Sequence, residues 1–370
     1  MNAGGRASTL GACAKNPEYS LRRSIDITIV SLYNFTMNRV SRRMAMLRGR
    51  HEPVVDAERY LLEGALRGRT ARKVRSALRR LEPVTLRTPR WSAPQPFLER
   101  LALDLAVGEP RLLCRTVSFR PMMGRSPAEA RNFVLRLLTE LWDGGEARPL
   151  PIVMDRRGFT RAASDLFEAA HRDSAQAVAL LGHGAEHLPV EVLEDLGQAW
   201  RLYTGWAGDN RRCTMLISGT VDVPTLGAGT VALELTDLSD AEVAECLIQH
   251  YGSIPSGMLE PVVKICGGVP GVLDAMLAGV TQARNLPTNP GDALRRVGGV
   301  GEELRGAVQG VMASPDIADR LHQLADGLPH SEDAELDRDL LMVGLARRAR
   351  QPGPPQVVLR AHLLAAAAFA

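Results

Sequence analysis

Short apolar runs and helical patterns alternate through the middle of this chain. The run at 177–181 is continuously apolar, which is typical of a strand buried on both faces of a sheet. Segments with apolar residues three and four apart separate such runs and predict helices. This alternation indicates βαβ crossovers and a parallel sheet, so the predicted fold class is α/β. The predicted strands are 83–88, 111–119, 177–181, 213–218 and 231–235, and the predicted helices are 96–106, 127–142, 162–172 and one that follows Pro189.

One of these helices carries a clear start signal. Ser126 stands at the N-cap position, Pro127 at the first helical position and Glu129 at the third. A serine and a glutamate at this spacing can bond to each other's backbone amides, and proline suits a position whose amide has no helical partner. The helix at 127–142 is therefore predicted to begin with a capping box.

Beyond Leu238 the pattern becomes helical. A helix is predicted to begin after Ser239, further helices follow to about Arg284, and 287–291 is predicted to be a linker. The last block holds three helical segments and two short strands that flank a proline-rich turn. Three helices and a hairpin form the outline of a winged helix. The segments are helices at 302–312, 315–325 and 332–342, and strands at 343–347 and 356–360.

The amino-acid composition is typical of a globular protein and indicates no particular reaction. The 370 residues are 45% hydrophobic and 24% charged, which suits a globular protein of two or three domains. No apolar stretch approaches the ~18 residues of a membrane helix, and 1–19 lack the apolar core of a signal peptide. The five cysteines are scattered and include no CxxC pair, so neither a disulfide framework nor a zinc ribbon is indicated. We expect a soluble, cytoplasmic protein with no membrane contact.

The order of several local strings resembles the AAA+ and STAND classes of P-loop ATPases. The string at 178–188, VALLGHGAEHL, resembles the strand that normally ends in an Asp-Glu pair. The string at 214–220, TMLISGT, resembles the next strand, which ends in a small polar sensor residue, here Ser218. The string at 233–247 is similar to the last core strand and the first lid helix. The resemblance covers about 81–285.

A fourth string belongs to the same resemblance. Residues 267–270, GGVP, look like the Gly-x-Pro lid motif, whose proline packs near the adenine in STAND proteins. The resemblance implies a parallel-sheet, P-loop NTPase-like (AAA+) core with a helical lid and a C-terminal winged helix. It divides the chain into a basic, mainly helical N-terminal region at 1–80, a degenerate nucleotide-binding core at 81–236, a lid at 237–290 and a winged-helix domain at 291–370.

The phosphate-binding motif of these ATPases is missing. The motif GxxxxGK[ST] should follow the first strand, where its glycines let backbone amides wrap the phosphates and its lysine neutralises them. The corresponding residues at 88–95 read TPRWSAPQ, with Pro94 in place of the lysine and Gln95 in place of the magnesium-binding hydroxyl. Pro89 and Pro94 remove two amide donors. Arg90 is then predicted to meet a phosphate only as a surface contact.

The acid pair that binds magnesium and activates water is missing too. Its place reads Gly182, His183 and Gly184, and Glu186 is predicted to lie past the site. The string at 183–187 matches HxxEH, but zinc proteases need both histidines on one continuous helix. Glycines precede this string and Pro189 follows it, so we predict a strand-to-helix turn and no metal site. A glycine-rich stretch at 298–301 follows no strand and is predicted to be a linker, not a dinucleotide loop.

Charge is distributed unevenly along the chain. Residues 1–100 contain 20 Lys and Arg against 8 Asp and Glu, whereas the remainder contains 25 against 34. The segment 39–90 alone has 15 basic residues and 5 acidic ones. It is either a solvated surface or an electrostatic site for nucleic acid or an acidic protein. The third winged-helix segment is acidic, so DNA would be repelled there. The candidate contact residues are Arg72, Lys73, Arg75, Arg79 and Arg80.

These observations favour a non-catalytic pseudo-ATPase that acts as a scaffold or regulatory subunit. It would assemble with a homologous ATPase or an effector, as a homo- or hetero-oligomer. No cofactor is required, and any ATP or ADP binding is expected to be weak and independent of magnesium, at Ser218, Pro270 and Arg90. Two alternatives stay open. One is a nucleic-acid-associated helper subunit of the transposition or replication type, and the other is an ATPase with a non-standard site.

Overall fold

The computed structural model describes 67–108, 112–142, 155–173, 176–220, 229–278, 280–349 and 353–369, together with Val223, Leu226 and Gly227. The predicted basic N-terminal region is therefore described only from Arg67 onward, and its part at 1–66 lies outside the described residues. In the described part of the chain, no helix is long and apolar enough to cross a membrane.

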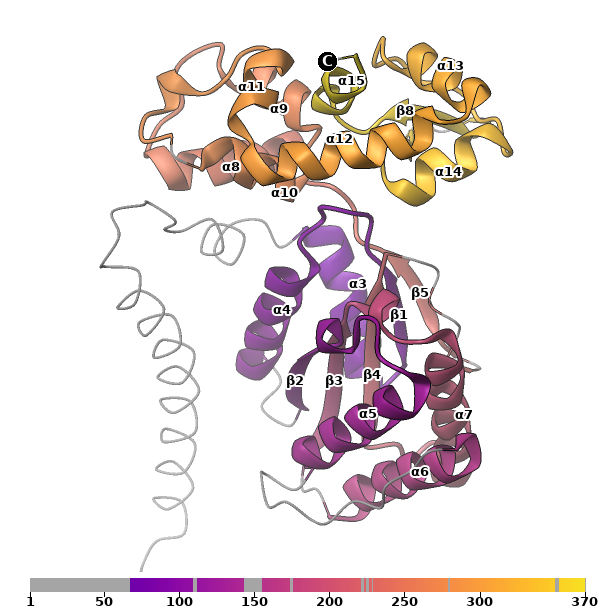
Figure 1. Cartoon of the computed structure of the whole chain (residues 1–370). Helices are drawn as coiled ribbons and strands as arrows, with labels where there is room; N and C mark the ends of the chain where they lie inside the picture. Colours follow the sequence, from indigo (N-terminus) through magenta and orange to yellow (C-terminus); the bar gives the residue numbers. More distant parts are fainter. Residues whose placement is uncertain are drawn as a thin grey trace, which may run out of the picture. The chain divides into compact units, whose positions relative to one another are not determined.

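The centre of the structure is a parallel sheet of five strands (Figure 1). Its strand order is β2-β3-β4-β1-β5, so the first strand of the described chain lies between the fourth and the fifth. The predicted α/β class and all five predicted strands are confirmed, to within two residues at each end. The strands are β1 (Val84–Arg87), β2 (Leu112–Ser118), β3 (Ala177–His183), β4 (Cys213–Gly219) and β5 (Val231–Glu234).

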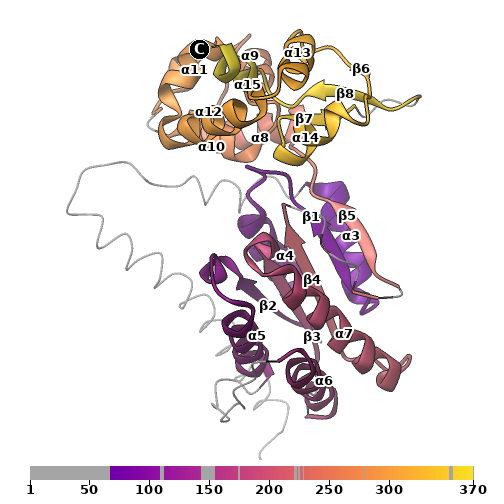
Figure 2. The ribbon, with the colours of Figure 1, turned by 45° about the vertical axis from the view of Figure 1, so that its right-hand side comes forward.

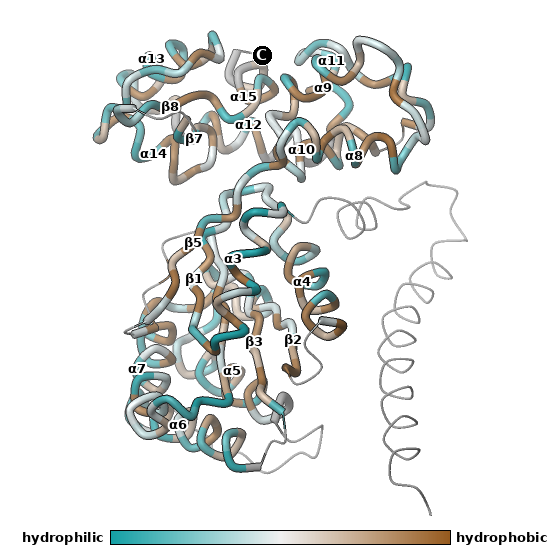
Figure 3. The backbone as a smooth tube through the Cα atoms, turned by 180° about the vertical axis from the view of Figure 1, so that it is seen from behind, coloured by the Kyte–Doolittle hydropathy of each residue, from teal (hydrophilic) through white to brown (hydrophobic). Residues whose placement is uncertain are grey.

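Helices cover both faces of this sheet (Figures 1 and 2). Leu180, Met215 and Ile217 point into one hydrophobic cluster with α5, α6 and α7, whereas Leu181 and Leu216 point into another with α3 and α4. This division follows from the two-residue period of a strand. The strands are mainly hydrophobic, as Figure 3 shows. The helices are α3 (Gly68–Arg79), α4 (Pro94–Gly108), α5 (Pro127–Trp142), α6 (Arg156–Asp173) and α7 (Val190–Ala207).

The capping boxes at two helix starts explain why the helices begin where they do. At α5 the Ser126 amide donates to the Glu129 carboxylate at 2.9 Å, and the Glu129 amide donates to the Ser126 hydroxyl at 3.3 Å. Ser239 and Glu242 form the same reciprocal pair at the start of α8 (Asp240–Tyr251). The predicted start of α5 and the predicted helix after Ser239 are both confirmed.

The described residues after β5 form a helical region with one continuous hydrophobic cluster. That cluster runs through both the predicted lid and the predicted winged-helix domain, and the boundary between them stays a prediction. A small antiparallel sheet has the order β6-β8-β7. The elements are α9 (Leu259–Cys266), α10 (Pro270–Leu277), α11 (Pro290–Arg296), α12 (Gly298–Met312), α13 (Pro315–Leu324), β6 (His330–Ser331), α14 (Leu336–Val343), β7 (Ala346–Arg348), β8 (Gln356–Leu359) and α15 (His362–Phe369).

Several predictions about this region were wrong in detail. The glycine-rich stretch at 298–301 is the first turn of α12 and not a linker, and the Gly301 amide donates to the Val297 carbonyl at 3.4 Å. The linker at 287–291 ends in a helix start, since Asn289 caps α11 by accepting the Asp292 amide at 2.8 Å. Helix α14 begins later than predicted, because Asp333 accepts the Leu336 amide at 3.0 Å. The elements β6 and α15 were not predicted.

Candidate functional site at the position of the phosphate loop

The loop that follows β1 lies at the carboxyl edge of the sheet. Strand β1 pairs with β4 in the register Leu86 with Ser218, and the Thr88 amide donates to the Gly219 carbonyl at 2.7 Å. Ligands of open parallel sheets bind at this edge. The loop 88–95 therefore occupies the place of a phosphate loop, as the alignment of the sequence on the following helix predicted.

The first turn of α4 offers few amides to a phosphate. The helix begins at Pro94, and its third residue is Pro96, so Gln95 is the one residue among the first three with a backbone N–H. The Gln95 side chain donates to Glu99 at 2.9 Å within the same helix. A helix N-terminus binds anions through its free amides, and two prolines remove most of them here.

The loop keeps the backbone turns that glycine favours, although it has no glycine. Trp91 has φ 59° and Ala93 has φ 49°, both in the left-handed region. Such a conformation is unfavourable for residues with a Cβ, by about 1–2 kcal/mol each. Contacts from the surrounding structure must therefore hold the loop in this form.

Some of these contacts come from the loop itself and from the residue before α3. Within the loop, the Ser92 amide donates to the Pro89 carbonyl at 3.1 Å, and the Ser92 hydroxyl donates to the same oxygen. Arg67 lies just before α3, and its guanidinium donates to the Ser92 carbonyl and lies over the Phe97 ring. Ser92 is fully buried, and its hydroxyl bonds within the loop.

The other contacts come from the C-terminal helical region. The Gly271 amide, in the first turn of α10, donates to the Trp91 carbonyl at 2.8 Å. The Arg360 guanidinium donates to the Arg90 carbonyl at 2.6 Å. Gly344 lies beside the loop, and an added Cβ there would lie 3.4 Å from the Arg90 amide nitrogen. The four successive carbonyls of 89–92 thus all accept hydrogen bonds from the protein itself.

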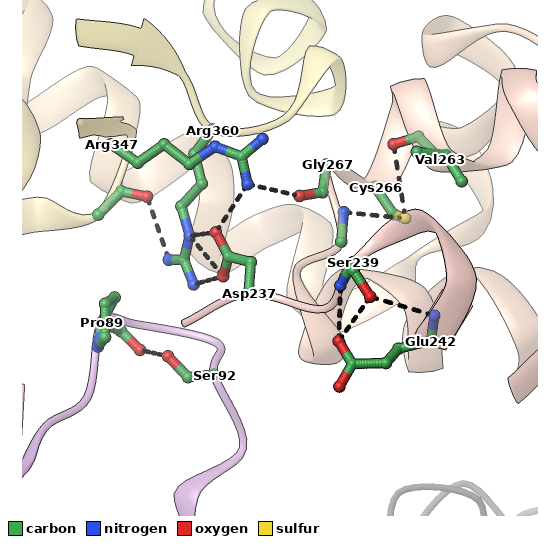
Figure 4. Close-up of polar contacts among 12 residues, drawn as sticks. Pro89, Ser92, Asp237, Ser239, Glu242, Val263, Cys266, Gly267, Arg347 and Arg360 are labelled. Atoms are coloured by element: carbon green, nitrogen blue, oxygen red, sulfur yellow. Dashed lines mark hydrogen bonds and ion pairs between the residues drawn. The ribbon is translucent and has the colours of Figure 1, made fainter. Parts of the chain in front are cut away.

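Arg360 and Asp237 form a buried ion pair that the half-exposed Arg347 also contacts (Figure 4). Asp237 follows β5 and precedes α8, and its carboxylate accepts from Arg360 Nε at 2.9 Å and from Arg360 Nη2 at 2.5 Å. Arg360 also donates to the Gly344 carbonyl at 3.3 Å. Arg347 donates to Asp237 at 3.4 Å and to the Gly267 carbonyl at 3.2 Å. We call Asp237, Arg347 and Arg360 the Asp237 network.

Arg67 brings a second buried cation to the same place. Its side chain is almost fully buried, and burial lowers the pKa of Arg67 to about 10, against the attraction of Asp237, so it stays protonated at neutral pH. One of its terminal nitrogens, Nη1, has no hydrogen-bond partner among the residues that the structure describes. The electrostatics here are therefore set by two buried guanidiniums and one buried carboxylate.

The place of the acid pair holds no pair of carboxylates. Strand β3 ends at His183, Gly184 has φ 80°, and a short 3-10 turn at Ala185–His187 leads to Pro189, so the predicted strand-to-helix turn is confirmed. Burial lowers the pKa of His183, against the attraction of Glu186. No group of three metal-ligating side chains occurs in the described part of the chain.

Glu186 follows the last residue of β3 by three positions and lies beside the end of β4. Its carboxylate accepts the Thr220 amide at 3.1 Å, directly after β4. The contact arises because β3 and β4 are neighbours, with His183 in register with Ser218. This single carboxylate therefore caps the end of β4.

The three residues predicted to be remnants of a nucleotide site lie in different surroundings. The Ser218 hydroxyl is fully buried and donates to the Gly182 carbonyl at 3.1 Å. Pro270 is buried and begins α10, next to the Gly271 amide that contacts the loop. The side chain of Arg90 is exposed. The structure thus brings Arg90 and the start of α10 to one place, through backbone contacts.

Of the five basic residues proposed to contact a polyanion, four are exposed on or beside α3 and Arg75 is half-buried. Arg75 lies 3.8 Å from Asp104 of α4, and Arg80 is paired with Glu82 at 2.8 Å. The part of the basic segment at 39–66 lies outside the described residues.

No protein-family model matches the sequence, and no curated protein sequence matches it either. Among solved structures, a Walker-type ATPase of Pyrococcus abyssi has a TM-score of 0.52 and 15% identity, with 82% of this chain and 95% of that chain covered. A STAND protein of Pyrococcus horikoshii with a tetratricopeptide-repeat sensor has a TM-score of 0.37 and 13% identity, with 79% and 41% covered. A Cdc6 protein of Pyrobaculum aerophilum has a TM-score of 0.44 and 13% identity, with 82% and 92% covered.

The match to the Walker-type ATPase covers most of both chains, with a TM-score of 0.52. The fold is therefore AAA+/P-loop ATPase-like, as the resemblance of the sequence strings implied. The cofactor that this fold implies is ATP with magnesium. The residues at the site do not fit that group, because the lysine, the hydroxyl, the acid pair and most of the helix-terminal amides are absent and the loop carbonyls bond to the protein.

Proposed function

We propose that this chain is a pseudo-ATPase that acts as a scaffold or regulatory subunit. The observation that carries the proposal is the 88–95 loop, which has the position of a phosphate loop but none of its chemistry. A phosphate loop presents amides and a lysine to its ligand. This loop presents a helix start with two prolines and has its carbonyls engaged by Arg67, Gly271 and Arg360.

The contacts of the Asp237 network with the loop are a second observation that supports this proposal. In the ATPases that the chain resembles, a lid proline packs near the adenine. Here the residue after Pro270 bonds directly to the loop, and Arg360 bonds the loop to Asp237. Protein groups thus join the lid to the loop without a nucleotide. A fixed arrangement of this kind suits a surface that binds a partner, either a homologous active ATPase or an effector.

Release of phosphate from ATP tests the absence of catalysis. With magnesium present, we expect turnover below ~0.01 per second, far under the range of about 1–1,000 per second that is typical of enzymes. Pro94→Lys should not raise it, because the change adds the lysine and one backbone N–H but leaves Pro96 in the first turn and supplies no acid pair. Turnover above this level that Glu186→Gln abolishes would contradict the proposal, whereas turnover that Glu186→Gln leaves unchanged indicates a contaminating ATPase.

A further inference from the structure

Helix α3 has two chemically opposite faces. Ala71, Val74, Ala77 and Leu78 are fully buried, and they pack in the cluster that includes β1 and α4. The other face carries cations along the whole helix, and α3 contains no acidic residue. The exposed residues of this face are Arg69, Arg72, Lys73, Ser76, Arg79 and Arg80.

The structure separates the cations that are already neutralised from those that are not. Arg75 faces Asp104, and Arg80 forms a pair with Glu82. In contrast, Arg69, Arg72 and Lys73 are exposed and have no ion pair within the described part of the chain, and Arg72 donates only to the Gly68 carbonyl of its own helix. These three residues lie within a span of about 6 Å along the helix axis.

The chemistry of this face fits a phosphate backbone better than a protein. A protein interface needs an apolar centre with large side chains. The large hydrophobic residues that are exposed in the described structure lie elsewhere, for example Leu103 and Val107 on α4 and Trp206 on α7. A duplex carries one negative charge per about 1.7 Å of axis, and each cation that meets a phosphate releases condensed counterions.

We propose that the exposed face of α3, through Arg69, Arg72 and Lys73, binds the phosphate backbone of a nucleic-acid duplex without sequence preference. Contacts to phosphate position a protein and carry no base information. This surface is separate from the 88–95 loop, so the inference goes beyond the proposed function and holds whether or not ATP is hydrolysed.

The test is a titration of the full chain, without nucleotide, against a fluorescent 20-base-pair DNA duplex at 50 to 200 mM salt. The variant is Arg69→Gln, Arg72→Gln, Lys73→Gln. The matched control is Arg157→Gln, Arg161→Gln, Arg201→Gln, which removes the same charge from exposed positions on α6 and α7. We expect the α3 variant to reduce the slope of log K against log salt by about 2 to 3, and the control to reduce it by less than about 1.

Binding of other duplexes and of an acidic polypeptide shows whether the ligand of α3 is DNA, RNA or an acidic protein. A scrambled DNA should bind as well as the first, and duplex RNA of the same length shows whether the sugar matters. Absence of binding at 50 mM salt would overturn the inference. So would equal losses in the two variants, a slope that the α3 variant leaves unchanged, or polyglutamate that binds with equal affinity, which would indicate an acidic protein as partner. Phosphate release is measured separately and decides only the proposed function.

Discussion

Arg360 joins three parts of the described chain through one buried guanidinium. It bonds to Asp237 after β5, to the Arg90 carbonyl in the loop and to the Gly344 carbonyl after α14. Only 1% of Arg360 is exposed. A buried pair of this kind does not stabilise a fold strongly against an apolar replacement of both partners, but removal of one partner leaves an uncompensated buried charge.

We therefore expect Arg360→Met to lower the free energy of unfolding by about 3 kcal/mol. The double variant Asp237→Asn, Arg360→Met should recover part of this loss, because it also removes the buried charge of Asp237. Arg347→Gln is the matched control, since Arg347 contacts the same aspartate from a half-exposed position and should cost less than about 1 kcal/mol. Urea unfolding measures all three. Equal losses for Arg360→Met and Arg347→Gln would show that Arg360 does not hold the Asp237 network together.

The lowered pKa of His183 predicts that acid reduces the stability of the fold. Burial lowers the pKa of His183 below its usual value near 6.5, so the unfolded chain takes up the proton at a higher pH than the folded chain. Stability should therefore decrease as the pH falls below 6.5, in a window above that of the carboxylates. Burial also lowers the pKa of His171 and His362, so the effect has several contributors.

The variant His183→Asn isolates one contributor. Between pH 7.5 and 5.5 it should lose less stability than the unchanged protein, as measured by urea unfolding at each pH. A comparison at pH 8, where both proteins are uncharged at this position, gives the cost of the substitution itself. A steeper loss in the variant would mean that His183 gains a proton more readily when folded.

At the scale of elements, the contact between the 88–95 loop and α10 depends on the absence of one side chain. A Cβ at Gly271 would lie 3.0 Å from the Trp91 carbonyl oxygen and 3.3 Å from its Cα. Gly271 is helical, so it is glycine here because of space and not because of its backbone angles. Close approach of two backbones is what this position requires.

Gly271→Ala should therefore separate α10 from the loop and lower stability by about 1–3 kcal/mol, the usual cost of overpacking. Gly306→Ala, in the interior of α12 where an added Cβ meets nothing within 4 Å, is the matched control and should raise stability by about 0.5–1 kcal/mol. Thermal unfolding of the two variants compares them directly. A gain in stability for Gly271→Ala as well would mean that the loop does not pack on α10.

The sequence predicts the strands and helix starts well, but it does not predict the long-range contacts between side chains. The strands are predictable because buried parallel strands are short apolar runs, as at 177–181, and the start of α5 because Ser126 and Glu129 are local. The Asp237 network is not predictable in this way, since Asp237 and Arg360 are 123 residues apart and no local pattern pairs them. Arg67 and Ser92 are likewise joined only by the fold. The local sequence shows that the phosphate-loop motif is absent, whereas only the fold shows which protein groups bond to the loop.

At the scale of the whole described chain, an AAA+/P-loop ATPase-like core and a helical region meet at the loop that follows β1. Their contacts include backbone amides and carbonyls and the Asp237 network. We infer that these groups hold the arrangement that a nucleotide would otherwise stabilise. Addition of nucleotide should therefore change neither stability nor shape.

Titration of the purified full chain with ATP by calorimetry, with and without magnesium, tests this central claim most directly. We expect no heat, or weak binding that magnesium does not alter, because the groups that would hold a magnesium–triphosphate are absent. Magnesium-dependent binding tighter than ~10 μM, which corresponds to about 7 kcal/mol, would contradict the claim. Such a result would mean that a functional phosphate site exists where the loop bonds to Arg67 and Arg360.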